Sequence, residues 1–175
     1  MKSRKLNKHW KIDELENLIN KKIPPDVRLT LASSTLGTVI ASLGKHLIKT
    51  YGYSVTDTVL KRELRELGKK DAVKLKKILG LEQTTEGNVK SIINIAAIIL
   101  GLKLGLIDKQ KVGVVKCPFY DSLKEYKQPF MCNACIEYNK GLVKELIGNE
   151  FSVKRVKWLF DGNESCVFDV TKRLK

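Results

Sequence analysis

Apolar residues in the first hundred positions recur every three or four residues, which is the spacing of amphipathic helices. This spacing predicts helices over residues 12–21, 27–51, 56–67, 70–79 and 88–100. Pro24 and Pro25 separate the first two helices, and Gly52 ends the second. Gly68 is expected to divide the third predicted helix from the fourth, since glycine is a poor helix former. The N-terminal half is therefore predicted to be helical.

The pattern changes after residue 101. Residues 102–107 and 112–117 have the short, β-branched character of strands, with the DKQK sequence at 108–111 as the turn between them. A helical turn at 121–126 and a helix over 131–147 follow, and strands at 151–160 and 166–172 flank the turn sequence DGNES.

These elements predict an α/β (α+β) fold in which a helical N-terminal half packs on a roughly four-stranded antiparallel sheet. The length favours one domain over residues 1–175, with a helical extension at 1–25, a helical half at 26–101 and a β-β-α-β-β half at 102–175.

The predicted helix 27–51 carries many small residues three and four positions apart. Small side chains let another backbone or a ligand approach a helix closely, so the pattern fits tight helix packing as well as a binding surface. As a ligand pocket the candidate residues are Ser34, Gly37, Thr38 and Ala41. An apolar cavity between this helix, the predicted helix 88–100 and the sheet, beside Gly37 and Ala41, would hold a hydrophobic small molecule.

Composition narrows the functional classes. The formal net charge is +14, but the lysines are scattered and interspersed with acidic residues, so specific nucleic-acid binding is not expected.

The longest apolar runs, 29–43 and 92–107, are shorter than a bilayer span, and no membrane span is expected. The N-terminus lacks an apolar signal segment, which indicates a reducing, cytoplasmic location. An exposed apolar helix at 92–100 would favour a homodimer.

Four cysteines are the strongest chemical signal in the chain. Cys117, Cys132, Cys135 and Cys166 have the spacing C-x14-C-x2-C-x30-C. In a reducing compartment, clustered cysteines point to metal or redox chemistry more than to disulfides. Four thiolates suit tetrahedral Zn²⁺, and an iron–sulfur cluster accepts the same ligands. Lysines near the pair Cys132 and Cys135, together with a helix N-terminus, are expected to favour their thiolate forms.

The motifs K-C-P-F at 116–119, C-N-A-C at 132–135 and G-N-E-S-C-V-F at 162–168 together resemble the 4-vinyl reductase (V4R) domain. They are also similar to L-2-amino-thiazoline-4-carboxylic acid hydrolase-like proteins. The resemblance covers roughly the last 75 residues. It implies an antiparallel sheet flanked by helices, as in transport-particle subunits that hold a fatty acyl chain, and it implies metal or iron–sulfur ligation by the four cysteines. The lysine-rich composition resembles that of methanogenic archaea.

Two classes of function follow. The first is a binding or sensing module for a hydrophobic small molecule, with a zinc site that braces the fold or senses redox state and with a regulatory protein as its partner. The alternative is an enzyme, either an iron–sulfur reductase of vinyl groups or a hydrolase with an open metal site. No catalytic triad, phosphate-binding loop or H-E-x-x-H motif is present, so the sequence identifies no catalytic residue.

Overall fold

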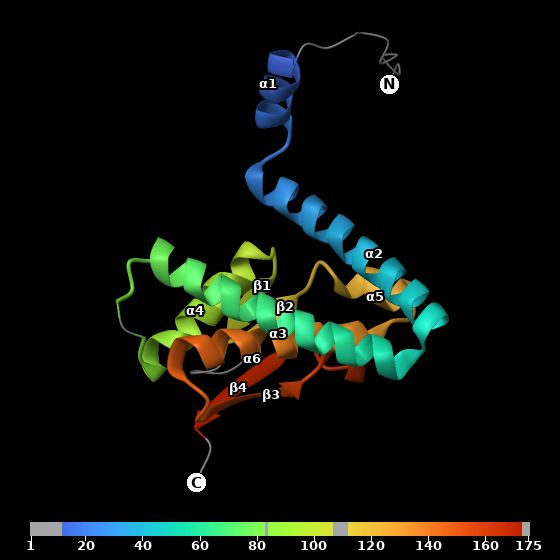
Figure 1. Ribbon diagram of the computed structural model, residues 1–175. Helices are drawn as coiled ribbons and strands as arrows, with labels where there is room; N and C mark the ends of the chain where they lie inside the picture. The colour runs from blue at the N-terminus through green and yellow to red at the C-terminus, as the bar shows by residue number, and fades with distance from the viewer. Residues whose placement is uncertain (1–11, 83, 107–111, 173–175) are drawn as a thin grey trace.

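The computed structural model describes residues 12–82, 84–106 and 112–172. The expected turn at 108–111 lies outside the described residues. Figure 1 shows a helical N-terminal half followed by two strand pairs, with the helix of residues 133–147 between them in the sequence. The α-helices are α1 (Ile12–Lys22), α2 (Pro25–Tyr51), α3 (Tyr53–Ile78), α4 (Glu86–Ile99), α5 (Tyr120–Glu125) and α6 (Asn133–Ile147). The short 3-10 helices are η1 (Pro129–Cys132) and η2 (Leu159–Asp161), and the strands are β1 (Lys103–Leu106), β2 (Val112–Lys116), β3 (Phe151–Lys157) and β4 (Val167–Lys172).

Helices α1, α2 and α4 confirm the predicted helices 12–21, 27–51 and 88–100, with end shifts of one or two residues. Pro25 opens α2, where its missing N–H costs nothing, and Gly52 ends it with a φ of +78° that glycine adopts without strain. Helix α1 projects away from the rest of the molecule at the far end of α2 (Figure 1).

The predicted break at Gly68 is wrong, because α3 runs unbroken from Tyr53 to Ile78. Gly68 lies at a close crossing with α6, where a Cβ atom would sit 2.1 Å from the carbonyl oxygen of Tyr138. Gly141 on α6 faces the carbonyl of Arg65 in the same way, also at 2.1 Å. The two glycines are therefore present for backbone contact between α3 and α6, and this packing outweighs the weak helix propensity of glycine.

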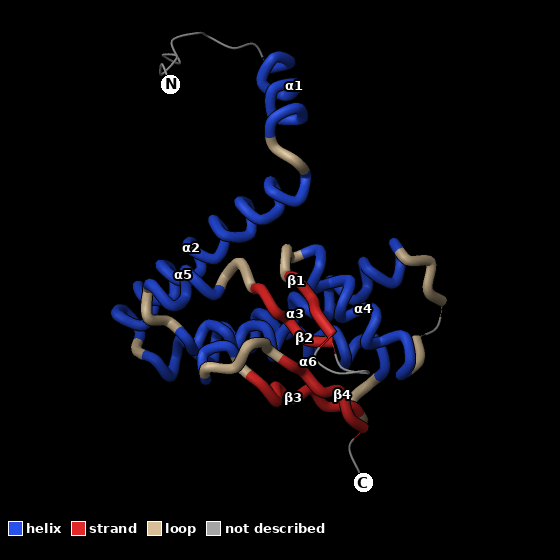
Figure 2. The backbone as a smooth tube through the Cα atoms, turned by 180° about the vertical axis from the view of Figure 1, so that it is seen from behind, coloured by secondary structure: helices blue, strands red, loops and turns tan. Residues whose placement is uncertain are grey.

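The four antiparallel strands are present, but the expected single sheet is not. The strands form two separate two-stranded sheets, β1–β2 and β3–β4, seen as distinct red segments in Figure 2. One isolated bridge links them, with hydrogen bonds of 2.8 and 3.0 Å between the backbones of Val114 and Cys166. Pro118, two residues after β2, has no N–H to extend the pairing, and the register of the second ribbon is irregular between Arg155 and Lys157.

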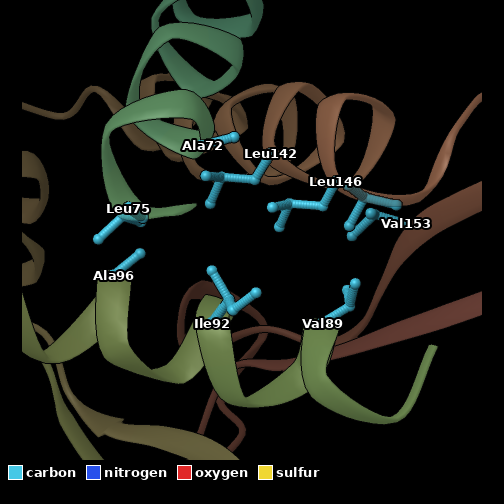
Figure 3. Close-up of a cluster of buried hydrophobic side chains, with 9 residues drawn as sticks. Ala72, Leu75, Val89, Ile92, Ala96, Leu142, Leu146 and Val153 are labelled. Atoms are coloured by element: carbon cyan, nitrogen blue, oxygen red, sulfur yellow. The ribbon is translucent and has the colours of Figure 1, made fainter. Parts of the chain in front are cut away.

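Two apolar clusters hold the elements together. The larger one joins α3, α4, α6 and β3, as Figure 3 shows, and it fixes the orientation of α6. Its fully buried members include Ile92 and Leu142. The smaller cluster packs Ala41 of α2 against Leu123 of α5 and Met131 of η1. Together they position the segments on either side of the C-N-A-C sequence.

Helix α2 exposes large apolar side chains and buries small ones. Its buried residues are the small Ser33, Gly37, Ala41 and Gly44, whereas several of its leucines and valines are exposed. Among the described helices, α2 is long and apolar enough to cross a bilayer by length and composition, and 22% of that apolar window is buried in the fold.

Candidate metal centre

The four cysteines come from separate elements, and three of them lie within electrostatic reach of the fourth. Cys117 follows β2, Cys132 ends η1, Cys135 lies in the first turn of α6 and Cys166 precedes β4. The backbone bridge from Val114 to Cys166 brings the last cysteine beside β2, three residues before Cys117. The charges of Cys117, Cys132 and Cys166 all act on the thiol of Cys135, so the four predicted ligands share one electrostatic environment.

All four cysteines are free, partly buried thiols. Burial raises the pKa of Cys117 to about 11 and that of Cys132 to about 12. Burial also raises the pKa values of Cys135 and Cys166. The expectation that the cysteine pair would favour thiolates is therefore wrong for the metal-free chain. Desolvation of the charged form outweighs the nearby positive charge.

Several N–H groups nevertheless face these sulfur atoms. The backbone N–H of Leu159 donates to Cys166 Sγ at 3.4 Å. Hydrogen bonds from the backbone of Phe119 and Tyr120 lower the pKa of Cys117, although burial raises it more. Such donors stabilise a negatively charged sulfur, and metal-bound thiolates commonly have them.

The indole of Trp158 is another donor at this site. Its Nε1 is buried and has no hydrogen-bond partner among the described residues. It lies close enough to Cys132 to lower the pKa of that thiol, against the larger opposing effect of burial. A buried N–H without an acceptor is costly, and a sulfur that became charged would supply one.

Arg155 adds a positive charge. Its guanidinium stacks over the Trp158 ring, with Cζ 3.9 Å from the ring centroid, and its Nη1 donates to the carbonyl oxygen of Cys132 at 3.3 Å. The charge lowers the pKa values of Cys132, Cys135 and Cys166, although burial dominates each of them. Sequence reasoning missed Arg155 and Trp158, because their only signal is that both lie in the predicted strand 151–160.

The thiols converge without reaching ligand distances. Within residues 12–82, 84–106 and 112–172, no three histidine, cysteine, aspartate or glutamate side chains lie close enough together to hold a metal ion. The donor set is all sulfur, which is the chemistry of Zn²⁺ and iron–sulfur sites. Closing such a site would require movement of the sulfur atoms toward one another and the loss of their protons.

The predicted pocket residues lie beside this centre. A Cβ atom on Gly37 would be 3.0 Å from Cδ1 of Phe119, two residues after Cys117, and Thr38 Oγ1 lies 2.9 Å from Ser122 Oγ. Ala41 is fully buried in the smaller apolar cluster, and the carbonyl of Ser34 accepts a hydrogen bond from Thr38 Oγ1. The small face of α2 thus packs on α5, and a pocket at these residues stays a prediction.

No family model, curated protein or solved structure matches the chain. The resemblance to the 4-vinyl reductase domain therefore stays a prediction from the cysteine motifs.

Proposed function

We propose that this chain is a binding or sensing module that holds one Zn²⁺ ion with Cys117, Cys132, Cys135 and Cys166. The proposal is supported by two observations. Cys117, Cys132 and Cys166, up to 49 positions apart in the sequence, all act electrostatically on Cys135, and a backbone bridge holds Cys166 beside β2. Four cysteine ligands leave no open position on a tetrahedral ion, so the proposed role is structural or redox-sensing rather than catalytic.

The surrounding donors support a thiolate site. Backbone N–H groups face Cys117 and Cys166, the unpartnered indole N–H lies near Cys132, and Arg155 contributes a positive charge. Four thiolates around a divalent cation carry a net charge of −2, and outer donors of this kind offset it. Neutral thiols would need none of them.

The proposed ligand is a hydrophobic small molecule at Ser34, Gly37, Thr38 and Ala41, where it would enter by separating the contacts that α2 now makes with Phe119 and α5. Because α5 has only six residues and begins three positions after Cys117, a ligand that moved α5 would also disturb the cysteine site. This connection supports a sensor in which metal or redox state and ligand occupancy influence each other.

Metal analysis of protein purified without oxygen tests the metal assignment. We expect one zinc per chain, a colourless solution, and loss of the zinc in Cys132→Ser, whereas Asn133→Ala, next to it, should keep the metal. Absence of bound metal from protein supplied with zinc would contradict the proposal. A brown protein with charge-transfer absorption would favour the iron–sulfur reductase instead. An enzyme with an open metal site would keep zinc but also hydrolyse a substrate.

Native mass spectrometry of the gently purified chain tests the ligand assignment. A copurified hydrophobic molecule that is lost in a Gly37→Leu variant would support it. A chain that never carries or takes up a long-chain fatty acid would contradict it.

A further inference from the structure

The exposed face of α2 repeats with a period that helices use to pair. Apolar residues recur at alternating intervals of three and four, through Leu29, Ala32, Leu36, Val39 and Leu43. Leu36, Val39 and Leu43 are 47%, 56% and 56% exposed. A period of 3.5 residues keeps one seam turned toward another helix of the same repeat. No charged residue interrupts the seam between Leu29 and Gly44.

Two further sets of exposed apolar residues lie beyond this seam, one at each end. On α1, Ile12 and Ile19 are 73% and 39% exposed, and α1 stands away from the body (Figure 1). At the opposite end of α2, Tyr51, Tyr53 and Val55 are all more than half exposed. Both sets are therefore available to a partner.

The charges at these two ends are complementary. The first turns of α1 expose Asp13 and Glu16, its last turn exposes Lys21 and Lys22, and the last two turns of α2 expose Lys45 and Lys49. Residues 27–56 contain no acidic residue. Two copies of α2 that pair in opposite directions bring the acidic first turns of each α1, which lie farthest from α2, toward the basic end of the partner's α2. Parallel pairing would instead place acid beside acid and base beside base.

We propose that a second copy of this chain covers this surface, with the two α2 helices antiparallel and each α1 reaching across to the partner's α2–α3 corner. The area that such a dimer must bury supports an interface that includes both α1 and α2. Paired helices about 40 Å long and 10 Å wide give roughly 800 Å² in total, short of the ~1,000 Å² of a stable interface. The two α1 helices, each about 16 Å long, raise the total above it.

Sedimentation velocity of the full chain at several concentrations tests the proposal. We expect a dimer for the natural sequence and a monomer for Leu36→Glu. The matched control is Leu31→Glu, on the same helix and 57% exposed but off the seam, and it should remain dimeric. A monomeric natural chain would overturn the proposal, as would equal effects of the two variants.

Charge exchange tests the orientation without touching the seam. Lys49→Glu and Glu16→Lys should each weaken the dimer several-fold, and the double variant should recover it. Failure of recovery would exclude the antiparallel arrangement. A natural chain that stays monomeric and floats with phosphatidylcholine vesicles would show instead that α2 meets lipid.

Discussion

At the residue scale, burial raises the pKa values of the cysteine thiols more than the nearby positive charge lowers them. Arg155 and the N–H donors lower the thiol pKa values, but desolvation raises them further, so the thiols are neutral near pH 7 when no metal is bound. A metal ion must therefore displace protons to bind. The cysteine thiols are therefore expected to become thiolates only when the cation binds.

Zinc affinity is accordingly expected to rise with pH. With pKa values of about 11 for Cys117 and about 12 for Cys132, both thiols are protonated throughout pH 6–8. Each ligand that loses a proton on binding should increase the apparent affinity about tenfold per pH unit. Competition against a chromophoric chelator between pH 6 and 8 measures this slope. A pH-independent affinity would contradict the use of buried neutral thiols as ligands.

Trp158→Phe removes the buried indole N–H and keeps an aromatic ring beside Arg155. We expect zinc still to bind at one per chain, with an affinity lowered about 10- to 100-fold, as is typical for loss of an outer-shell hydrogen bond. The same chelator competition measures the change. Tyr51→Phe, at a ring that is 62% exposed, serves as the control. An unchanged affinity would show that the indole does not support the sulfur.

At the scale of elements, the crossing of α3 and α6 depends on two glycines. The backbones approach so closely that a methyl group on either helix would collide with a carbonyl oxygen of the other. These helices carry the larger apolar cluster, and α6 carries Cys135, so their spacing sets both the core and the position of the site.

Gly141→Ala is expected to lower the free energy of unfolding by about 3 kcal/mol or more, because rigid backbone cannot yield as a side chain would. Urea denaturation monitored by circular dichroism measures the loss. Gly80→Ala, where open space surrounds the added atom and φ is +64°, should cost only about 1–2 kcal/mol. A stability loss at Gly141 no larger than at Gly80 would contradict the close crossing.

The same two helices share a buried carboxylate. Glu137 on α6 is 4% exposed and accepts hydrogen bonds from Arg65 Nε at 2.9 Å and from Lys140 Nζ at 2.6 Å. Burial alone would raise the pKa of Glu137, but the hydrogen bonds to Lys140 and Arg65 outweigh it and lower the pKa below 4.5.

Because the folded pKa is depressed, this carboxylate stabilises the fold above its unfolded pKa. The contribution is lost as the pH falls from about 4.5 through the folded value. Glu137→Gln should therefore cost about 1–2 kcal/mol at pH 7 and less at pH 3. Thermal unfolding at both pH values measures the difference, and an equal cost at pH 3 and pH 7 would contradict the ion-pair interpretation.

At the scale of the whole molecule, the candidate cysteine site lies where the two strand pairs approach each other. Among the described residues, the Val114–Cys166 bridge is the only β-pairing between the two pairs, and the cysteines come from both pairs and from the segment that starts α6. A bound metal would link the two ribbons directly. Its removal should loosen this end of the molecule more than the α3–α4–α6 core.

Zinc should consequently raise the melting temperature, and a chelator should lower it. Free zinc at a hundred times its dissociation constant adds about 2.7 kcal/mol to the free energy of unfolding. Differential scanning calorimetry with and without chelator measures the shift, and Cys166→Ser should show no response to zinc. Equal melting temperatures for the zinc-loaded and stripped chain would contradict a structural metal.

The sequence by itself determined most of the helices and the places of the strands, because apolar periodicity and turn residues act locally. It also singled out the cysteines, since thiols are rare enough for their spacing to carry information. It failed at Gly68, because helix propensity is a local property and the close contact with Tyr138 comes from a helix some seventy residues later.

Only the tertiary structure decided which distant residues meet. The division of four strands into two sheets depends on a bulge and on one backbone bridge, and neither has a signal in apolar spacing. The approach of Arg155 and Trp158 to Cys132 depends on how β3 passes the start of α6. The leucines of α2 are exposed because its small residues pack against the α5 region. The sequence of one helix does not show which of its faces packs inward.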